Sequence, residues 1–171
     1  MPQEQRITDS DRQELLRALE TGPRRHRFSD WPNHDVPKVA AGVYTVWENS
    51  RLVYVGMSGR SLTAEDIAAP DEPSKAKGLW TRLDSHASGR RSGDQFCVYV
   101  CDRFVVPRLT DEQQAQIGDG VLSLDALTRQ HIREHFEYRY VPLDNGKDAF
   151  ALEREVQRGG LAAGKPFLNP L

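Results

Sequence analysis

The chain has 171 residues, of which 38% are hydrophobic and 28% are charged. This is the length of one folded domain with enough apolar side chains for a core, which excludes a generally disordered chain. The 23 basic and 25 acidic side chains leave a net charge of −2, so a uniformly basic nucleic-acid coat is excluded as well.

The first half of the chain mixes helix and strand signals. Residues 9–20 carry an apolar stripe behind a capping-box pattern of Ser10 and Gln13, which predicts a helix that Gly22 ends. Two β-branched and aromatic runs, at 43–47 and 52–57, predict a β-hairpin. A long polar loop over 58–77 then leads to a helix predicted over 78–88.

The second half predicts a strand over 95–106, two short helices within 107–135 that Thr110 and Ser123 cap, a strand over 136–141 and a helix over 147–158. The order of elements is mixed. It favours an α+β fold with a small, mostly antiparallel central sheet, in which a third strand joins the hairpin, an extra strand and a helical insertion are added, and helices flank the sheet.

Two features indicate a cytoplasmic protein. No apolar run approaches the roughly 20 residues of a membrane span, so no membrane partner is expected, and the polar N-terminus has no signal-peptide pattern. On an extended strand, Cys97 and Cys101 would lie about 13 Å apart, too far for a disulfide. Two reduced thiols fit a reducing compartment.

The predicted hairpin carries a pair of tripeptides, Gly42-Val43-Tyr44 on the first strand and Tyr54-Val55-Gly56 on the second. Each tripeptide alone is ordinary strand sequence. Together with Arg82 and His86 on a helix, Glu153 on a later helix and Asn169 near the C-terminus, they resemble the GIY-YIG nuclease superfamily. The resemblance covers about residues 41–105 and 136–171, with Val in place of Ile in both tripeptides and an inserted segment at about 107–135.

The resemblance implies a metal-dependent endonuclease that hydrolyses DNA phosphodiester bonds. It places the nuclease domain at 41–171, behind a helical and basic extension at 1–40, and implies one Mg²⁺ or Mn²⁺ per active site. Double-stranded DNA is the expected partner, and a homodimer or a partner protein is compatible with it. The implied catalytic residues are Tyr44, Tyr54, Arg82, His86, Glu153 and Asn169.

Three functions remain open at this point. A restriction or defence enzyme is the first candidate. The second is a structure-specific DNA repair nuclease or the nuclease subunit of a larger complex, and the third is a catalytically silent nucleic-acid-binding module. The intact set of catalytic residue types argues against the third. Substrate preference separates the first two: linear duplex with a recognition site against branched, flapped or damaged DNA.

Helix spacing selects one of two glutamates as the metal ligand. Glu153 falls on the apolar stripe of the predicted helix 147–158, whereas Glu155 points to another face. A carboxylate on the sheet-facing side is costly unless it is paired or metal-bound, and Mg²⁺ accepts a single carboxylate plus waters and phosphate. We therefore expect Glu153 to hold the metal, with an ion pair to Arg82 as the alternative.

The remaining catalytic candidates each have a chemical role. Arg82 and His86 are four residues apart and leave one side of their helix, where the guanidinium can grip a phosphate. Tyr44 is the favoured general base or water positioner, and His86 is the competing base because imidazole accepts a proton near neutral pH. Asn169 could hydrogen-bond Glu153 or a tyrosine and hold it in place.

Basic residues cluster near the predicted site, as contact with a phosphate backbone requires. Residues 75–91 and the arginines at 24–27 are rich in positive charge, whereas residues 110–126 hold several acidic and no basic side chains. The acidic insertion is therefore expected to face away from DNA or to meet a partner protein. The candidate substrate-binding residues are Gly56, Ser58, Arg60, Lys75, Lys77, Arg90 and Arg91.

Strand parity predicts the register of the hairpin. Side chains alternate between faces, so Tyr44 and Tyr54 share a face only if the loop has an odd number of residues. A three-residue loop at 49–51 meets this condition and places Tyr44 opposite Gly56 and Tyr54 opposite Val46. A regular two-residue turn would instead put the two hydroxyls on opposite faces.

Overall fold

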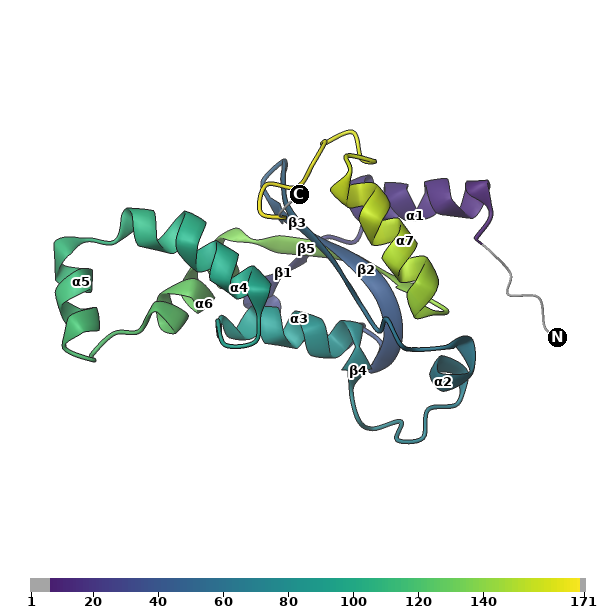
Figure 1. Cartoon of the computed structure of the whole chain (residues 1–171), viewed down its shortest axis with the longest axis horizontal. Helices are drawn as coiled ribbons and strands as arrows, with labels where there is room; N and C mark the ends of the chain where they lie inside the picture. Colours follow the sequence, from purple (N-terminus) through teal and green to yellow (C-terminus); the bar gives the residue numbers. More distant parts are fainter. Residues whose placement is uncertain (1–6, 170–171) are drawn as a thin grey trace.

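The fold is known from a computed structural model that describes residues 7–169. The first six residues of the predicted N-terminal extension therefore lie outside the described residues. Four strands form the main sheet in the order β1 (His26–Arg27), β5 (Glu137–Leu143), β2 (Val39–Glu48) and β3 (Arg51–Ser58), and all neighbours are antiparallel. The short β4 (Lys77–Gly78) pairs in parallel with the start of β2. The predicted α+β fold with a mostly antiparallel sheet is confirmed (Figure 1).

Helices cover both faces of this sheet (Figure 1). The helices α1 (Asp9–Thr21) and α7 (Gly146–Gln157) pack on the face that presents Val43 and Val55. The opposite face presents Tyr44 and Val46 to α3 (Leu79–Ser88) and α4 (Gln95–Val100). The alternation of side chains along β2 and β3 thus divides the interior into two hydrophobic cores.

Some of the remaining elements extend these layers, and others lie outside them. Residues 9–27 contribute α1 and β1 to the same layers as the rest of the chain. A short helix, α2 (Ala64–Ala68), lies within the predicted loop 58–77. The helices α5 (Asp111–Gly118) and α6 (Leu124–His135) form the predicted helical insertion, capped by Thr110 and Ser123 as expected, and α5 projects away from the sheet (Figure 1).

The predicted strand over 95–106 is wrong, because this segment is helical. Helix α4 continues into a π-helical turn (Cys101–Val105) and a 3₁₀ turn (Val106–Arg108). The buried side chains recur at helical spacing and pack on the sheet, which overrides the β-propensity of the Val and Tyr residues. The two cysteines therefore lie one helical turn apart rather than 13 Å. Both thiols are free and buried.

Two helix starts also differ in detail from the prediction. Thr8, rather than Ser10, caps α1, because its hydroxyl accepts the N–H of Asp11. Asp94 caps α4 by accepting the N–H of Cys97. Both caps satisfy backbone donors that the first turn of a helix leaves free.

The hairpin reaches the predicted register by an unexpected route. Its turn has two residues, and Trp47 pairs with Leu52, so the predicted three-residue loop is wrong. A β-bulge at Val46/Trp47 then shifts the pairing by one residue. Beyond it, Val46 pairs with Tyr54 and Tyr44 with Gly56, as predicted. The extra residue of the bulge replaces the extra residue of the loop, so the two tyrosines share one face.

Candidate active site

The shared sheet face brings Tyr44 and Tyr54 together with His86 of α3. The Tyr44 hydroxyl lies 2.7 Å from Nε2 of His86. The Tyr54 ring lies 6.4 Å from the Tyr44 ring and 6.1 Å from the imidazole, measured between centroids. Gly56 makes this arrangement possible, since a Cβ there would overlap the Tyr44 hydroxyl. Three of the predicted catalytic side chains therefore form one cluster.

Asp94, which the sequence did not suggest, contacts the ring nitrogen of His86 that does not face Tyr44. Its Oδ2 lies 2.7 Å from Nδ1 of His86 and accepts the hydroxyl of Ser85 at 2.6 Å. Its Oδ1 accepts the N–H of Cys97 at 3.1 Å. The His86 and Asp94 side chains are only 2% and 1% exposed, so this contact is shielded from water.

The direction of the hydrogen bonds follows from the charge of Asp94. Burial alone would raise its pKa, but the hydrogen bonds from His86, Ser85 and Cys97 lower it to about 2, so the group is a carboxylate that can only accept. Burial lowers the pKa of His86 against the opposing effect of Asp94, so the imidazole is neutral. Its Nδ1–H therefore donates to Asp94, and Nε2 accepts the hydroxyl proton of Tyr44.

The two tyrosines are electrostatically distinct. Tyr44 is 1% exposed, and burial raises its pKa well above the ordinary value. Tyr54 is half-buried; burial and then the charge of Glu153 raise its pKa, while Arg82 lowers it. The exposed Arg82 side chain also lowers the pKa of Tyr44. Arg82 is therefore placed where its charge favours negative groups among these side chains.

Glu153 approaches from the other side of the sheet. It lies on α7, whose buried stripe packs on the core opposite the tyrosines, and its half-buried side chain reaches the outer edge of β3. Burial raises its pKa, while the backbone N–H of Met57 and the charges of Arg154 and Arg60 lower it. Arg82 does not contribute, which disfavours the alternative of a Glu153–Arg82 ion pair. Glu155 points away, as predicted, and pairs with Arg12 of α1.

The surroundings of Glu153 fit a divalent cation. A half-buried carboxylate whose pKa burial raises gains from a hard cation, and Mg²⁺ is commonly held by one or two carboxylates. Another group of possible metal ligands consists of His86, Asp94 and Cys97, whose ligand atoms lie within 4.8 Å of one another. It does not fit a metal, because its His and Asp atoms bond each other and burial raises the pKa of the Cys97 thiol.

Asn169 lies at the edge of β3 rather than on Glu153 or a tyrosine hydroxyl, so that part of the prediction is wrong. Its Nδ2 donates to the carbonyl of Val55 at 2.8 Å, and its Oδ1 accepts the N–H of Val55 at 2.7 Å. The amide has the same donor and acceptor pair as a peptide group, so it continues the sheet by one side chain. It fixes the backbone between Tyr54 and Gly56.

Most of the predicted substrate-binding residues lie at the surface. Gly56 and Ser58 lie on β3, and Arg60, Lys75, Lys77 and Arg90 are exposed. The Arg60 guanidinium lies over the Phe150 ring and its charge lowers the pKa of Glu153, so Arg60 is close to the candidate metal ligand. Arg91 is half-buried, and its Nε lies 2.6 Å from Asp125 of α6. Arg91 is thus engaged within the chain and is the weakest of these candidates.

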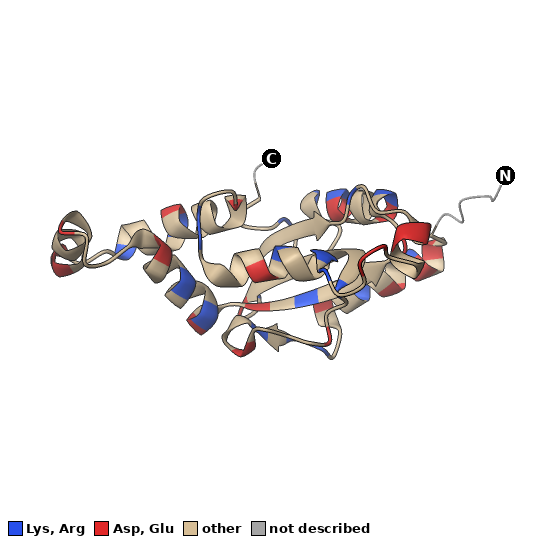
Figure 2. Cartoon of the chain, turned by 90° about the horizontal axis from the view of Figure 1, so that it is seen from below, with Lys and Arg blue, Asp and Glu red and all other residues tan. Residues whose placement is uncertain are grey.

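Charge is unevenly distributed along the molecule (Figure 2). The projecting helix α5 carries acidic and no basic side chains, as its sequence requires. At the start of β5, Arg25 and Arg27 both contact Glu137, so the basic cluster at 24–27 is partly neutralised.

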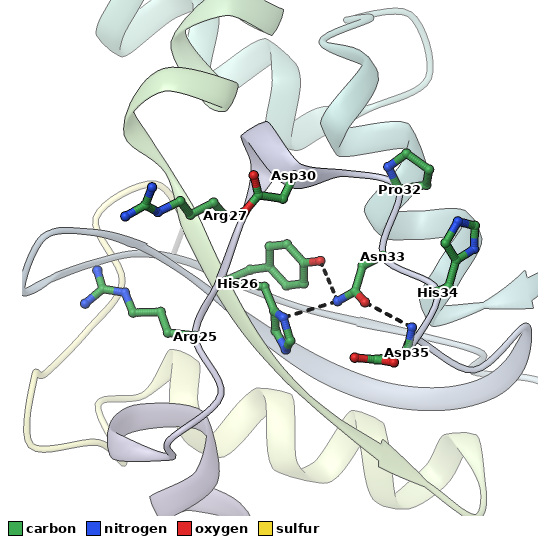
Figure 3. A pocket seen from close by; sticks show the side chains of 9 residues that line it. Arg25, His26, Arg27, Asp30, Pro32, Asn33, His34 and Asp35 are labelled. Atoms are coloured by element: carbon green, nitrogen blue, oxygen red, sulfur yellow. Dashed lines mark hydrogen bonds between the residues drawn. The ribbon is translucent and has the colours of Figure 1, made fainter.

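A hollow lies between the segment 25–35 and Tyr138 of β5 (Figure 3). It has a volume of about 340 Å³, and none of the predicted site residues lines it. Asn33 organises it by donating to His26 and to Tyr138. We assign the candidate active site to the tyrosine cluster, because Tyr44 and His86 hydrogen-bond each other directly there, whereas in the hollow Asn33 stands between His26 and Tyr138.

Comparisons with models of known protein families, with curated proteins and with solved structures found no match to this chain. Within residues 7–169, no helix is both long and apolar enough to cross a membrane.

Proposed function

We propose that the chain is a metal-dependent endonuclease that hydrolyses DNA phosphodiester bonds by GIY-YIG-type chemistry. The observation that carries the proposal is the hydrogen bond from Tyr44 to His86 on the face that also holds Tyr54. The charge of Arg82 lowers the pKa of both tyrosines and the charge of Glu153 raises it, so both groups lie near the cluster. Phosphodiester hydrolysis needs a proton acceptor, a cationic group for the phosphate and a ligand for a metal.

The hydrogen bond supports a joint role for Tyr44 and His86 as the base. Burial raises the pKa of Tyr44, so a tyrosinate does not form in advance. In the proposed step, the Tyr44 oxygen takes a proton from the attacking water while its own proton passes to Nε2 of His86. The two side chains act as one relay.

The other residues bind and stabilise the phosphate. Arg82 donates to the phosphate oxygens as negative charge develops on them. Tyr54, at the half-buried rim, orients the water or the phosphate through its hydroxyl. A divalent cation held by Glu153 would supply Lewis-acid stabilisation of the phosphate and of the leaving oxygen. The exposed cations Arg60 and Lys77 contact the flanking backbone of the DNA.

The test is a cleavage panel with the two glutamates as a matched pair. Wild type, Glu153→Gln and Glu155→Gln are incubated with Mg²⁺, Mn²⁺ or EDTA and with linear, branched and flapped DNA. We expect metal-dependent cleavage by wild type and Glu155→Gln, and none by Glu153→Gln, whose folding and DNA binding stay nearly unchanged. Cleavage in EDTA, or by Glu153→Gln, would contradict the proposal.

The same panel separates the candidate roles. Cleavage of linear duplex at defined sequences would identify a restriction or defence enzyme in the cytoplasm. Preference for flaps or branches would identify a repair nuclease, and DNA binding without cleavage by any variant would identify a silent binding module.

A further inference from the structure

Asp94 has a role that capping a helix does not explain. Five other helices of the described chain have a side-chain cap, and every one of those caps is a neutral Thr, Ser or Asn. Only α4 is capped by a carboxylate, and Asp94 is 2% exposed. Burying a carboxylate is costly, whereas Asn or Ser would satisfy the same N–H of Cys97. Its other contacts are the Ser85 hydroxyl and His86. A neutral oxygen would accept the hydroxyl equally well, so the charge serves His86.

We propose that Asp94 is a positioning residue for the hydrolysis, which holds the His86 imidazole with its proton on Nδ1 so that Nε2 accepts the proton of Tyr44. This inference rests on the proposed function. Both ring nitrogens of His86 are engaged at 2.7 Å, one by Asp94 and one by Tyr44. A neutral imidazole has one donor and one acceptor, so the partner at Nδ1 fixes the role of Nε2.

The consequence for catalysis is directional. While Asp94 is a carboxylate, the proton path runs from Tyr44 towards His86, and the imidazolium that forms lies beside a negative charge. If a hydrogen-bond donor replaced the carboxylate, Nδ1 of His86 would have to accept that hydrogen bond. The ring proton would then lie on Nε2, which would donate to the Tyr44 oxygen. The tyrosine would then have no acceptor for its own proton, and the relay would stop.

Asp94→Asn changes the two contacts made at Oδ2, those with His86 and with Ser85. The Asn carbonyl can still accept the N–H of Cys97 and cap α4, while its NH₂ group faces Nδ1 of His86. Ser85→Ala is the matched control, because it removes the other hydrogen bond to Oδ2 without changing which ring nitrogen carries the proton. We expect turnover of Asp94→Asn to fall by about 10³- to 10⁴-fold, as for other wrong-tautomer variants, with DNA affinity unchanged. Turnover of Ser85→Ala should stay within a few fold of wild type.

The tautomer is measured directly and without any substrate. In protein labelled with ¹⁵N-histidine, correlation spectra show which ring nitrogen carries the proton, and loss of signals in His86→Gln assigns the His86 pair. We expect the proton on Nδ1 in wild type and in Ser85→Ala, and on Nε2 in Asp94→Asn. A wild-type His86 protonated on Nε2 would overturn the inference even if Asp94→Asn did not fold.

The pH profile of turnover gives a second reading. The titratable and charged groups around His86 are Tyr44, Tyr54, Arg82, Asp94 and Cys97, and Asp94 is the one that favours the imidazolium. The residual activity of Asp94→Asn should therefore persist to lower pH than that of wild type. A folded Asp94→Asn enzyme with wild-type turnover and an unshifted acidic limb would leave Asp94 a helix cap only.

Failure of the proposed function is distinguishable from failure of this inference. A wild-type protein that cleaves no DNA under any metal condition removes the endonuclease proposal and the positioning role with it. A wild-type protein that cleaves, together with an Asp94→Asn variant that flips the tautomer and keeps its turnover, removes the positioning role alone.

Discussion

Replacing Gly56 by Ala tests the geometry on which the active-site assignment depends. A Cβ at this position would overlap the hydroxyl and Cζ of Tyr44 and would lie 3.0 Å from Cε1 of Tyr54. The Tyr44 ring must move, and its hydrogen bond to His86 is lost. Overpacking costs about 1–3 kcal/mol and an unsatisfied buried polar group about 1–3 kcal/mol more, so we expect a loss of about 2–4 kcal/mol after relaxation.

For a chain of this length, that loss corresponds to a decrease in Tm of roughly 4–16 °C. Thermal unfolding measures the stability, and a DNA cleavage assay below the new Tm should show turnover reduced at least about 10²-fold, the usual contribution of a general base. Gly118→Ala is the control, because a Cβ there meets no atom within 4 Å.

A double variant locates the clash. Tyr44→Phe removes the hydroxyl that the new Cβ would meet, so Gly56→Ala should cost less stability in that background than in wild type. If Gly56→Ala kept the stability and turnover of wild type, the Tyr44 phenol would not lie against Gly56, and the proposed geometry of the relay would be wrong.

Three further predictions follow from the same contacts. Because burial lowers the pKa of His86, the unfolded chain takes up this proton first, so stability should fall as pH drops below about 6.5, and His86→Gln should flatten that slope in thermal melts. Arg82→Ala should mainly lower turnover. Arg91→Ala breaks an ion pair whose two side chains are each about 40% exposed, so it should leave turnover unchanged and alter the free energy of unfolding by no more than about 1 kcal/mol. Asn169→Ala removes two hydrogen bonds to Val55 and should cost about 1–3 kcal/mol in denaturant unfolding; an unchanged midpoint would refute its role at the sheet edge.

The fold was largely predictable because its strands and helices carry strong local signals. The hairpin, the caps at Thr110 and Ser123 and the last helix follow from patterns within a few residues. The segment 95–106 misled because β-branched and aromatic residues favour a strand locally, while the helical spacing of its apolar side chains reflects burial against distant elements. The bulge at Val46/Trp47 has no comparable local signal.

The site shows the same division. Strand parity relates Tyr44 to Tyr54, and helix spacing relates Arg82 to His86, but only the GIY-YIG resemblance joins these pairs in one predicted site. The choice of Glu153 over Glu155 follows from one helical stripe. Asp94 could not be found, since its importance depends on a contact to His86 across a loop and on a helix that had been taken for a strand. Asn169 was selected from the resemblance as a partner of Glu153 or a tyrosine. Its actual partner, the Val55 backbone, depends on how the C-terminal segment crosses β3.

That crossing has a consequence for how the protein folds as it is synthesised. The outer edge of β3 is covered by the N–H groups of Phe167 and Leu168 and by the Asn169 side chain. Asn169 lies 114 residues after its partner Val55, so on the ribosome this part of the hairpin edge remains open until residues 167–169 have emerged. An open strand edge is a template for pairing with other chains. The nascent hairpin is therefore more prone to pair with other chains before residues 167–169 arrive than after they cover Leu52, Val53 and Val55.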